Sequence, residues 1–297
     1  MSRSAGSRAN RRGEKPPSPE PLPAPAVDSH THLDIVLSGF RPEGGQPPAL
    51  EDVDAEIAEA AAVGVPRLVQ VGVDVDSSRW SAELAARHPN VLAAVALHPN
   101  EAGAGAATDD ALAEIDRLAA LPRVRAVGET GLDRFRTGPD GWAAQEASFR
   151  AHIRIAKDRG VALVIHDRDA HDEILRVLED EGAPEQTVFH CFSGDASFAR
   201  ACVERGFVLS FAGTLTFGNA GYLREAAALA PVEQLLVETD SPFLTPMPYR
   251  GRPNASRLVA HTVRALAEVT GVELEELCAH LTVTAERVFG SWETDRR

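Results

Sequence analysis

Six residues of types that can bind divalent metal ions stand at the ends of apolar runs. His30 and His32 are two residues apart, a spacing that points both imidazoles the same way in an extended segment. Four more candidates each follow a different apolar run: Glu129, His166, His190 and Asp240. Imidazole nitrogens with carboxylate oxygens suit zinc, manganese, nickel or iron better than calcium. The set is large enough for two divalent ions that share one bridging oxygen ligand.

The apolar runs before these residues predict the strands of a parallel sheet. They alternate with longer stretches of helical period, which is the order of an α/β fold. Near-continuous apolar residues indicate strands that are buried on both faces. The predicted strands are a short first one around 26–27, then 65–73, 91–97, 124–128, 161–165, 187–189, 207–211 and 235–237. The last two helices are expected at 274–280 and 283–289.

Eight strands alternating with helices within residues 27–297 predict a (β/α)8 TIM barrel, a fold of about 250 residues. The carboxyl ends of its strands meet on one face, where active sites lie. Candidate ligands that follow different strands therefore converge. The alternative is a set of hydrogen-bonded polar residues that merely close the barrel mouth. The number of His, Glu and Asp residues at strand ends weighs against this alternative, because buried polar groups without partners cost free energy.

Residues 1–26 differ in composition from the rest of the chain. They hold six prolines, four arginines and one lysine against two glutamates, with almost no large apolar side chains. Such a segment lacks the apolar surface needed to fold by itself. We expect a disordered, basic tail over residues 1–26 and one hydrolase domain over residues 27–297.

The whole chain is acidic, with 30 Lys plus Arg against 44 Asp plus Glu in 297 residues and a formal net charge of −14. This balance argues against a protein that coats nucleic acid through a basic face. No apolar run reaches about 18 residues, so we expect no membrane span, and the N-terminus lacks the apolar segment of a secretory signal.

The three cysteines have no paired spacing, which supports neither disulfides nor structural zinc and favours a cytoplasmic protein. Cys191 lies next to His190. Because neighbours on a strand point to opposite faces, Cys191 is expected to face the helical layer.

The strand-end motifs resemble those of the TatD family of metal-dependent deoxyribonucleases, which belongs to the amidohydrolase-like barrels. The resemblance extends from Val27 to Phe289, in the order and separations of the family. The motifs are Asp28-Ser29-His30-Thr31-His32-Leu33-Asp34, Gly128-Glu129-Thr130-Gly131-Leu132-Asp133, Ile165-His166-x-Arg168-Asp169-Ala170, His190-Cys191-Phe192-Ser193-Gly194 and Glu238-Thr239-Asp240-Ser241-Pro242.

The resemblance implies a hydrolase that cleaves phosphodiester bonds of DNA with magnesium, manganese or zinc in its site. It implies that one ion is held by His30, His32 and Asp240, the second by His166 and His190, and that Glu129 bridges them. Members are usually described as exonucleases or repair-type nucleases. Some have been assigned a role in deacylating mischarged transfer RNA.

Three further side chains have expected roles in such a reaction. Asp240 is the candidate that receives the proton of a water activated by two metal ions. His98 is expected to contact a substrate phosphate, or else to hydrogen-bond to a ligand residue. Arg168 is expected to bind a phosphate through two N–H groups, or else to pair with Asp133 or Asp169.

The sequence therefore predicts a monomeric two-metal phosphodiesterase that acts on DNA ends, short strands or single strands. Weak binding of long duplex is expected, because two divalent ions leave the charge strongly negative. An amidohydrolase or esterase with the same two ions, including one that deacylates mischarged aminoacyl-tRNA, is the alternative. A metal-binding scaffold without activity is a third possibility, which the complete ligand set disfavours.

Overall fold

The strands of the computed structural model, which describes residues 13–38, 49 and 53–293, form one parallel sheet in the order β1 to β8. They lie where the apolar runs predict them, although β1, β4 and β5 continue further towards their carboxyl ends. The strands are β1 (Val27–Thr31), β2 (Arg67–Val71), β3 (Val91–Val95), β4 (Val124–Asp133), β5 (Ala162–Arg168), β6 (Thr187–Phe189), β7 (Val208–Phe211) and β8 (Leu235–Val237).

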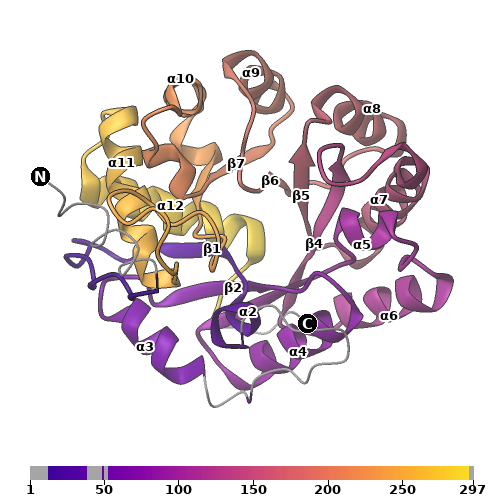
Figure 1. Ribbon diagram of the computed structural model, residues 1–297, viewed down its shortest axis with the longest axis horizontal. Helices are drawn as coiled ribbons and strands as arrows, with labels where there is room; N and C mark the ends of the chain where they lie inside the picture. The colour runs from indigo at the N-terminus through magenta and orange to yellow at the C-terminus, as the bar shows by residue number, and fades with distance from the viewer. Residues whose placement is uncertain (1–12, 39–48, 50–52, 294–297) are drawn as a thin grey trace, which may run out of the picture.

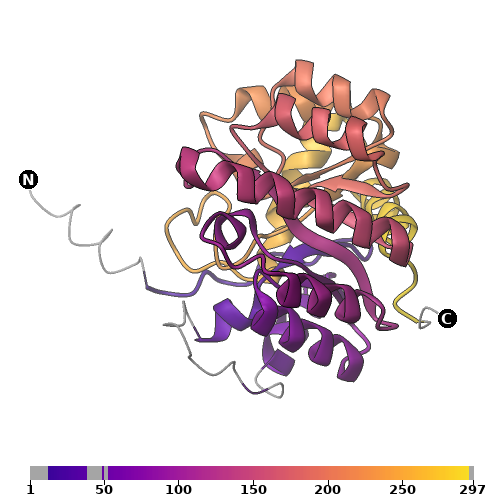
Figure 2. The ribbon, with the colours of Figure 1, turned by 90° about the vertical axis from the view of Figure 1, so that its right-hand side faces the viewer.

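The sheet curls into a nearly closed barrel because the segment after β8 returns to the end of β1. Thr31 and Ser241 form a parallel bridge. The His32 amide donates to the Ser241 carbonyl oxygen at 2.9 Å, and the Asp240 amide donates to the His30 carbonyl oxygen at 2.9 Å. Helices surround the strands in both ribbon views (Figure 1 and Figure 2). The predicted TIM-barrel fold is confirmed.

Helices follow the strands as the helical-period segments predict, with one difference near the carboxyl end. The expected pair at 274–280 and 283–289 is wrong: one helix spans both, because no Gly or Pro interrupts it and Leu281 continues its buried face. The helices are α2 (Leu33–Ser38), α3 (Asp54–Ala61), α4 (Val75–Arg87), α5 (Pro99–Gly103), α6 (Asp109–Ala119), α7 (Pro139–Arg159), α8 (His171–Glu181), α9 (Ala196–Glu204), α10 (Gly221–Leu229), α11 (Val259–Thr270) and α12 (Leu274–Phe289). Within the described ranges, none of these helices is long and apolar enough to span a bilayer.

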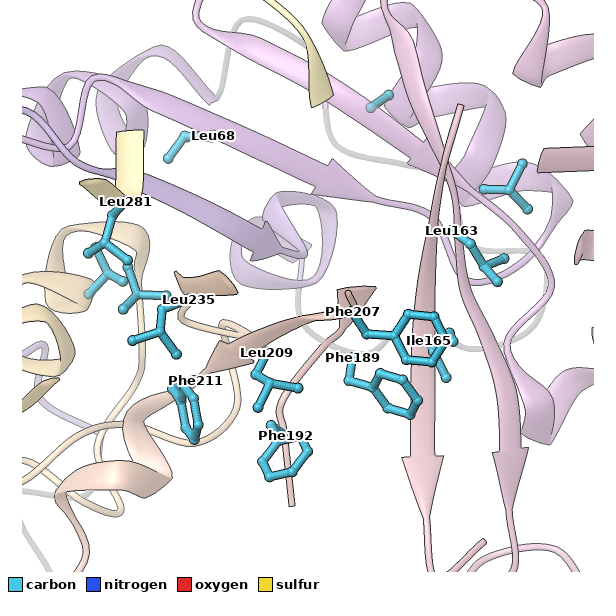
Figure 3. Close-up of a cluster of buried hydrophobic side chains, with 14 of the residues drawn as sticks. Leu68, Leu163, Ile165, Phe189, Phe192, Phe207, Leu209, Phe211, Leu235 and Leu281 are labelled. Carbon is cyan, nitrogen blue, oxygen red and sulfur yellow. The ribbon is translucent and has the colours of Figure 1, made fainter. Parts of the chain in front are cut away.

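Two groups of buried apolar side chains hold the barrel together. The inner group takes side chains from all eight strands, among them Val69, Val164 and Leu236, and includes Phe289 and Trp292 from the end of the chain. The outer group packs the other strand faces against the helices, and Figure 3 shows part of it around Phe189 and Leu209. Alternate residues of each strand therefore face the barrel interior and the helical layer, as strands buried on both faces require.

The prediction of a disordered tail over residues 1–26 is wrong for residues 14–26, while residues 1–12 lie outside the described residues. Arg252 donates to the carbonyl oxygens of Glu14 and Lys15 at 2.9 and 2.8 Å, and Arg264 donates to those of Glu20 and Pro21 at 2.8 and 3.1 Å. Leu22 is buried. An extended proline-rich chain has no internal hydrogen bonds, so its carbonyls are free to accept them from arginines distant in sequence. Composition alone does not reveal these partners.

His152 of α7 makes the stability of the barrel depend on pH. Its Nε2 atom accepts from the Leu97 amide at 3.1 Å, and Nδ1 lies 2.7 Å from the Ser148 carbonyl oxygen, so the neutral ring fits both partners. Burial lowers the pKa of His152 from 6.5 to about 4. Between these values the unfolded chain binds a proton that the folded chain excludes, so acidification favours unfolding.

We expect this histidine to reduce the free energy of unfolding by up to about 3 kcal/mol as the pH falls from 6.5 to 4. Urea unfolding of the wild type and of His152→Gln at several pH values measures the effect. Glutamine keeps a donor and an acceptor but does not titrate, so the stability difference between the two proteins should change with pH. Parallel stability curves would show that His152 does not contribute.

Candidate active site

Several candidate ligands continue the inward-facing positions of their strands. His166 stands two residues after the inward Val164 on β5, and His190 stands two residues after the inward Val188 of β6. Glu238 follows Leu236 at the end of β8 with the same spacing. His190 and Glu238 lie one residue past the ends of their strands, but their amides still donate to the neighbouring strands, to the carbonyl oxygens of Ile165 and Phe211 at 3.1 Å. The alternation of side chains therefore reaches them, and positions that carry apolar groups deeper in the barrel carry polar groups at its mouth.

The Glu129 side chain points into the barrel mouth, towards the other candidate ligands, only because the pairing of β4 with β5 is irregular. Val127 belongs to the outer apolar group, so regular alternation would turn Glu129 outward as well. The register of the two strands shifts between Val127 and Thr130. Such a shift redirects side chains. Gly131 then lies so close to β5 that a Cβ atom would stand 2.1 Å from the His166 carbonyl oxygen, and its φ of +142° also favours glycine.

His30, His32, Glu129 and Asp240 bring four ligand atoms together. The Nε2 atoms of the two histidines are 3.3 Å apart. His32 Nε2 lies 3.4 Å from both Glu129 Oε1 and Asp240 Oδ1, and His30 Nε2 lies 3.6 and 3.9 Å from the same two oxygens. His32 Nδ1 lies 3.0 Å from the Val71 carbonyl oxygen and is placed to donate to it, which directs Nε2 towards Glu129 and Asp240.

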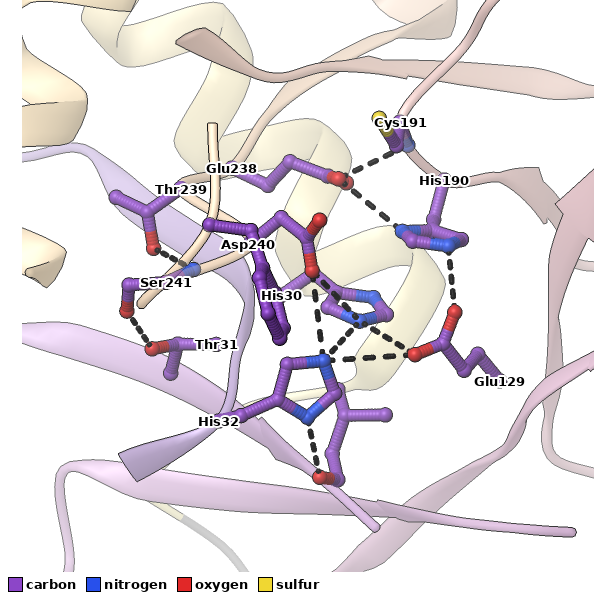
Figure 4. A network of polar contacts seen from close by, with 12 residues as sticks. His30, Thr31, His32, Glu129, His190, Cys191, Glu238, Thr239, Asp240 and Ser241 are labelled. Atoms are coloured by element: carbon purple, nitrogen blue, oxygen red, sulfur yellow. Dashed lines mark hydrogen bonds and ion pairs between the residues drawn. The ribbon is translucent and has the colours of Figure 1, made fainter. Parts of the chain in front are cut away.

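The second oxygen of Glu129 faces a different group of imidazoles. Its Oε2 atom lies 2.7 Å from His190 Nε2, 3.1 Å from His166 Nδ1 and 3.7 Å from His98 Nε2. Figure 4 shows Glu129 between His190 on one side and His32 and His30 on the other. Burial raises the pKa of Glu129, but His190 and His98 outweigh it, and the pKa stays well below its usual range. One ionised carboxylate thus joins both groups.

The side chains around Glu129 fit divalent metal ions. Neighbouring ligands of a tetrahedral zinc ion with bonds of about 2.1 Å are about 3.4 Å apart, close to the separations in the first group. Two imidazole nitrogens that face each other at 3.3 Å are a poor hydrogen-bonded pair but a good pair of ligands. Burial, followed by the charge of His190, lowers the pKa of His30 and keeps it in the neutral form that binds metal.

Two buried carboxylates that the sequence interpretation left without a role hold these ligands in place. Glu238 accepts from the Cys191 amide at 2.9 Å and from the Ser210 hydroxyl, and it lies 3.2 Å from His190 Nδ1. Asp28 accepts from the Thr239 amide and hydroxyl at 2.8 and 2.7 Å, next to Asp240. Burial raises the pKa of Asp28 to about 7, although bonds from Thr239 oppose the rise. Glu238 and Asp28 each stand two residues before a predicted ligand, Asp240 and His30, and this spacing is visible in the sequence.

A pocket of about 690 Å³ opens above the candidate ligands. Seven of the eight predicted site residues line it, and His30 is buried directly behind them; the seven are His32, His98, Glu129, His166, Arg168, His190 and Asp240. The structure therefore brings the whole predicted set together.

The pocket wall shows the neighbours of Arg168 and orients His98. Among the described residues Arg168 forms no ion pair with Asp133 or Asp169; its guanidinium carbon lies 4.6 Å from the Phe135 ring centre. His98 Nδ1 accepts from the Asn100 amide at 3.1 Å, and burial lowers the pKa of His98 to about 3. The ring is then neutral with its proton on Nε2, which lies near Glu129 and can donate to a substrate oxygen.

The expectation that Cys191 faces the helical layer is wrong. Strand β6 ends at Phe189, and Cys191 has a φ of +42°, so strand alternation no longer applies and the residue lines the pocket. Burial, followed by the charges of Asp240 and Glu238, raises the pKa of the Cys191 thiol well above its usual value. The thiol stays protonated and is a poor nucleophile.

Glu238→Gln tests whether this buried carboxylate supports metal binding. We expect metal affinity to fall about 10- to 100-fold, because His190 loses the charged partner that fixes its ring. Titration calorimetry of the metal-free protein with Zn²⁺ or Mn²⁺ measures the loss. Ser210→Ala is the matched control, since it removes one donor to Glu238 but keeps the charge. Unchanged affinity in Glu238→Gln would contradict a role in holding His190.

Comparison with known proteins agrees with this site. A family model described as TatD related DNase matches residues 27–290. A Mycobacterium tuberculosis protein named as an uncharacterized metal-dependent hydrolase TatD is 47% identical, over 89% of this chain and 97% of that protein. A Citrobacter rodentium protein named 3'-5' ssDNA/RNA exonuclease TatD is 34% identical, over 81% of this chain and 93% of that protein.

A solved structure shares the architecture as well. The crystal structure of YJJV, a TatD homologue from Escherichia coli, covers 90% of this chain and 98% of its own, with a TM-score of 0.80 and 26% identity. Family model, relatives and fold point the same way, and the chain belongs to the TatD family of metal-dependent hydrolases.

Proposed function

We propose that this hydrolase cleaves phosphodiester bonds at the ends of single-stranded nucleic acid, with DNA as its first substrate, and that it uses two divalent metal ions. The observation that carries the proposal is the position of Glu129, whose two oxygens face two separate groups of imidazoles at the pocket floor. The relative named as a single-strand exonuclease supports nucleic acid as the substrate.

The residues divide into two ligand sets that share one carboxylate. His30, His32 and Asp240 would hold one ion, His166 and His190 the other, and Glu129 would bind both. When bound, two such ions lower the pKa of an attacking water and offset negative charge on the phosphoryl group. Magnesium, manganese and zinc all accept oxygen ligands, and the imidazoles favour manganese or zinc.

Asp240 and the pocket wall supply the remaining steps. Asp240 would receive the proton of the attacking water on the carboxylate oxygen that does not face the histidines. Bonds from Thr239 to Asp28 and from the Asp240 amide to the His30 carbonyl oxygen hold its backbone in place. His98 donates from Nε2 to a phosphate oxygen. Arg168 offers its guanidinium to the same phosphate or the next one along the strand.

The size of the pocket and the net charge of the protein favour the ends of nucleic acid strands as the substrate. A pocket of about 690 Å³ is within the range of small-ligand sites, about 300–1,000 Å³, and has room for the end of a strand rather than for duplex. The net charge of −14 gives the protein little general attraction for phosphate. The proposal includes a monomer that acts in a reducing cytoplasm, where the free thiols of Cys191, Cys202 and Cys278 are stable.

Asp240→Asn should abolish hydrolysis of a single-stranded oligonucleotide. Loss of a general base costs about 10²- to 10⁴-fold in rate, and Asp240 is also a ligand, so we expect a loss of at least about 100-fold in kcat. The assay uses oligodeoxynucleotides labelled at the 5' or the 3' end, resolved on a gel. The label that disappears first gives the polarity of digestion.

Asp169→Asn is the matched control, because it makes the same change on the exposed wall of the same pocket. This variant should retain activity, and a chelator should stop the wild type until Mn²⁺ or Mg²⁺ is added. If the wild type binds metal but leaves both labelled strands intact, the phosphodiesterase proposal fails. A carbonyl ester, such as that of an aminoacyl-tRNA, is then the next substrate to assay.

A further inference from the structure

We infer that Phe135 and Tyr222 stack against unpaired nucleobases beside the pocket and thereby select single strands over duplex; this inference rests on the proposed function. Phe135 is 65% exposed and Tyr222 is 46% exposed. In the part of the chain that the structure describes, every other Phe, Tyr and Trp side chain is buried or half-buried. Tyr222 lines the pocket, and the Phe135 ring lies against Arg168, which also lines it.

Phe135 is held in position by the loop that follows β4. Asp133 Oδ1 accepts from the amides of Phe135 and Arg136 at 3.0 and 2.7 Å, and Asp133 Oδ2 lies 3.2 Å from His166 Nε2. The loop is thus tied to a candidate metal ligand. The Arg168 guanidinium covers one face of the Phe135 ring at 4.6 Å and also lines the pocket. A phosphate bound by Arg168 would place the adjoining base near the ring.

Tyr222 approaches the pocket from the first turn of α10. It also borders a second hollow of about 490 Å³, and the two hollows share Tyr222, His171 and Ser193 in their walls. A single-stranded nucleic acid whose end lies over the candidate ligands can therefore continue past Tyr222. Phe135 and Tyr222 follow different strands, β4 and β7, so they can contact different bases.

Charge and exposure both favour stacking as the source of affinity. An exposed aromatic ring costs free energy that a ligand recovers by covering it. A protein with a net charge of −14 gains little from general attraction to phosphate, whereas stacking on an aromatic ring contributes about 1–3 kcal/mol per base. Bases paired within a duplex do not offer their faces. Stacking thus provides a physical basis for selecting single strands.

The test compares binding of two hydrolysis-resistant phosphorothioate oligonucleotides, one with thymine bases and one abasic, to the metal-loaded wild type by fluorescence anisotropy. We expect the oligonucleotide with bases to bind at least about tenfold more tightly. Phe135→Ala and Tyr222→Ala should each lose much of this preference, while Phe135→Trp should retain it. Val283→Ala is the control, because Val283 is 64% exposed on α12 and does not line either hollow.

Equal affinity for the two oligonucleotides, or no binding of either, would overturn the inference. An equal loss for both in Phe135→Ala would also overturn it, since the ring would then act only by supporting Arg168. Hydrolysis of an ordinary oligonucleotide by the wild type is measured separately. A preference for bases without hydrolysis would refute the proposed phosphodiesterase activity alone, and hydrolysis without a preference would refute stacking alone.

Discussion

The buried carboxylate of Glu129 is the group on which the arrangement of the pocket depends. A buried charge is tolerated only where partners compensate it, and the partners of Glu129 are imidazoles that lie on β5 and just beyond the ends of β1, β3 and β6. Those strand ends must therefore meet at one level around it. The register shift in β4, the close approach of Gly131 to β5 and the return of the chain from β8 to β1 all serve this requirement.

The barrel separates stability from chemistry along its axis. Apolar side chains from all eight strands fill the interior, where Phe289 and Trp292 join them. Towards the carboxyl ends the inward positions become polar, first with Ser29, Ser210 and Glu238 and then with the candidate ligands. The apolar part supplies the free energy that offsets the burial of so many titratable groups. Loops at the mouth can then vary without loss of the fold.

Strand positions and candidate ligands could be predicted because both depend on local pattern: a short apolar run, followed by a His, Glu or Asp. The inward direction of Glu129 could not, since it depends on how β4 pairs with β5. Strand alternation does not predict the position of Cys191 for a related reason: the residue lies beyond the end of β6, where its φ of +42° turns the backbone. The composition of residues 14–26 does not indicate order, because the groups that donate to their carbonyl oxygens, Arg252 and Arg264 among them, lie more than 200 positions away.

The bridge between Thr31 and Ser241 joins positions 210 residues apart. During synthesis on the ribosome, β1 emerges early and has no partner on that side until nearly the whole barrel has been made. Contacts between such distant residues form late and slow the folding of a chain. The candidate ligand set that contains His30 and Asp240 is completed only in that last step, so a nascent or truncated chain has no assembled centre.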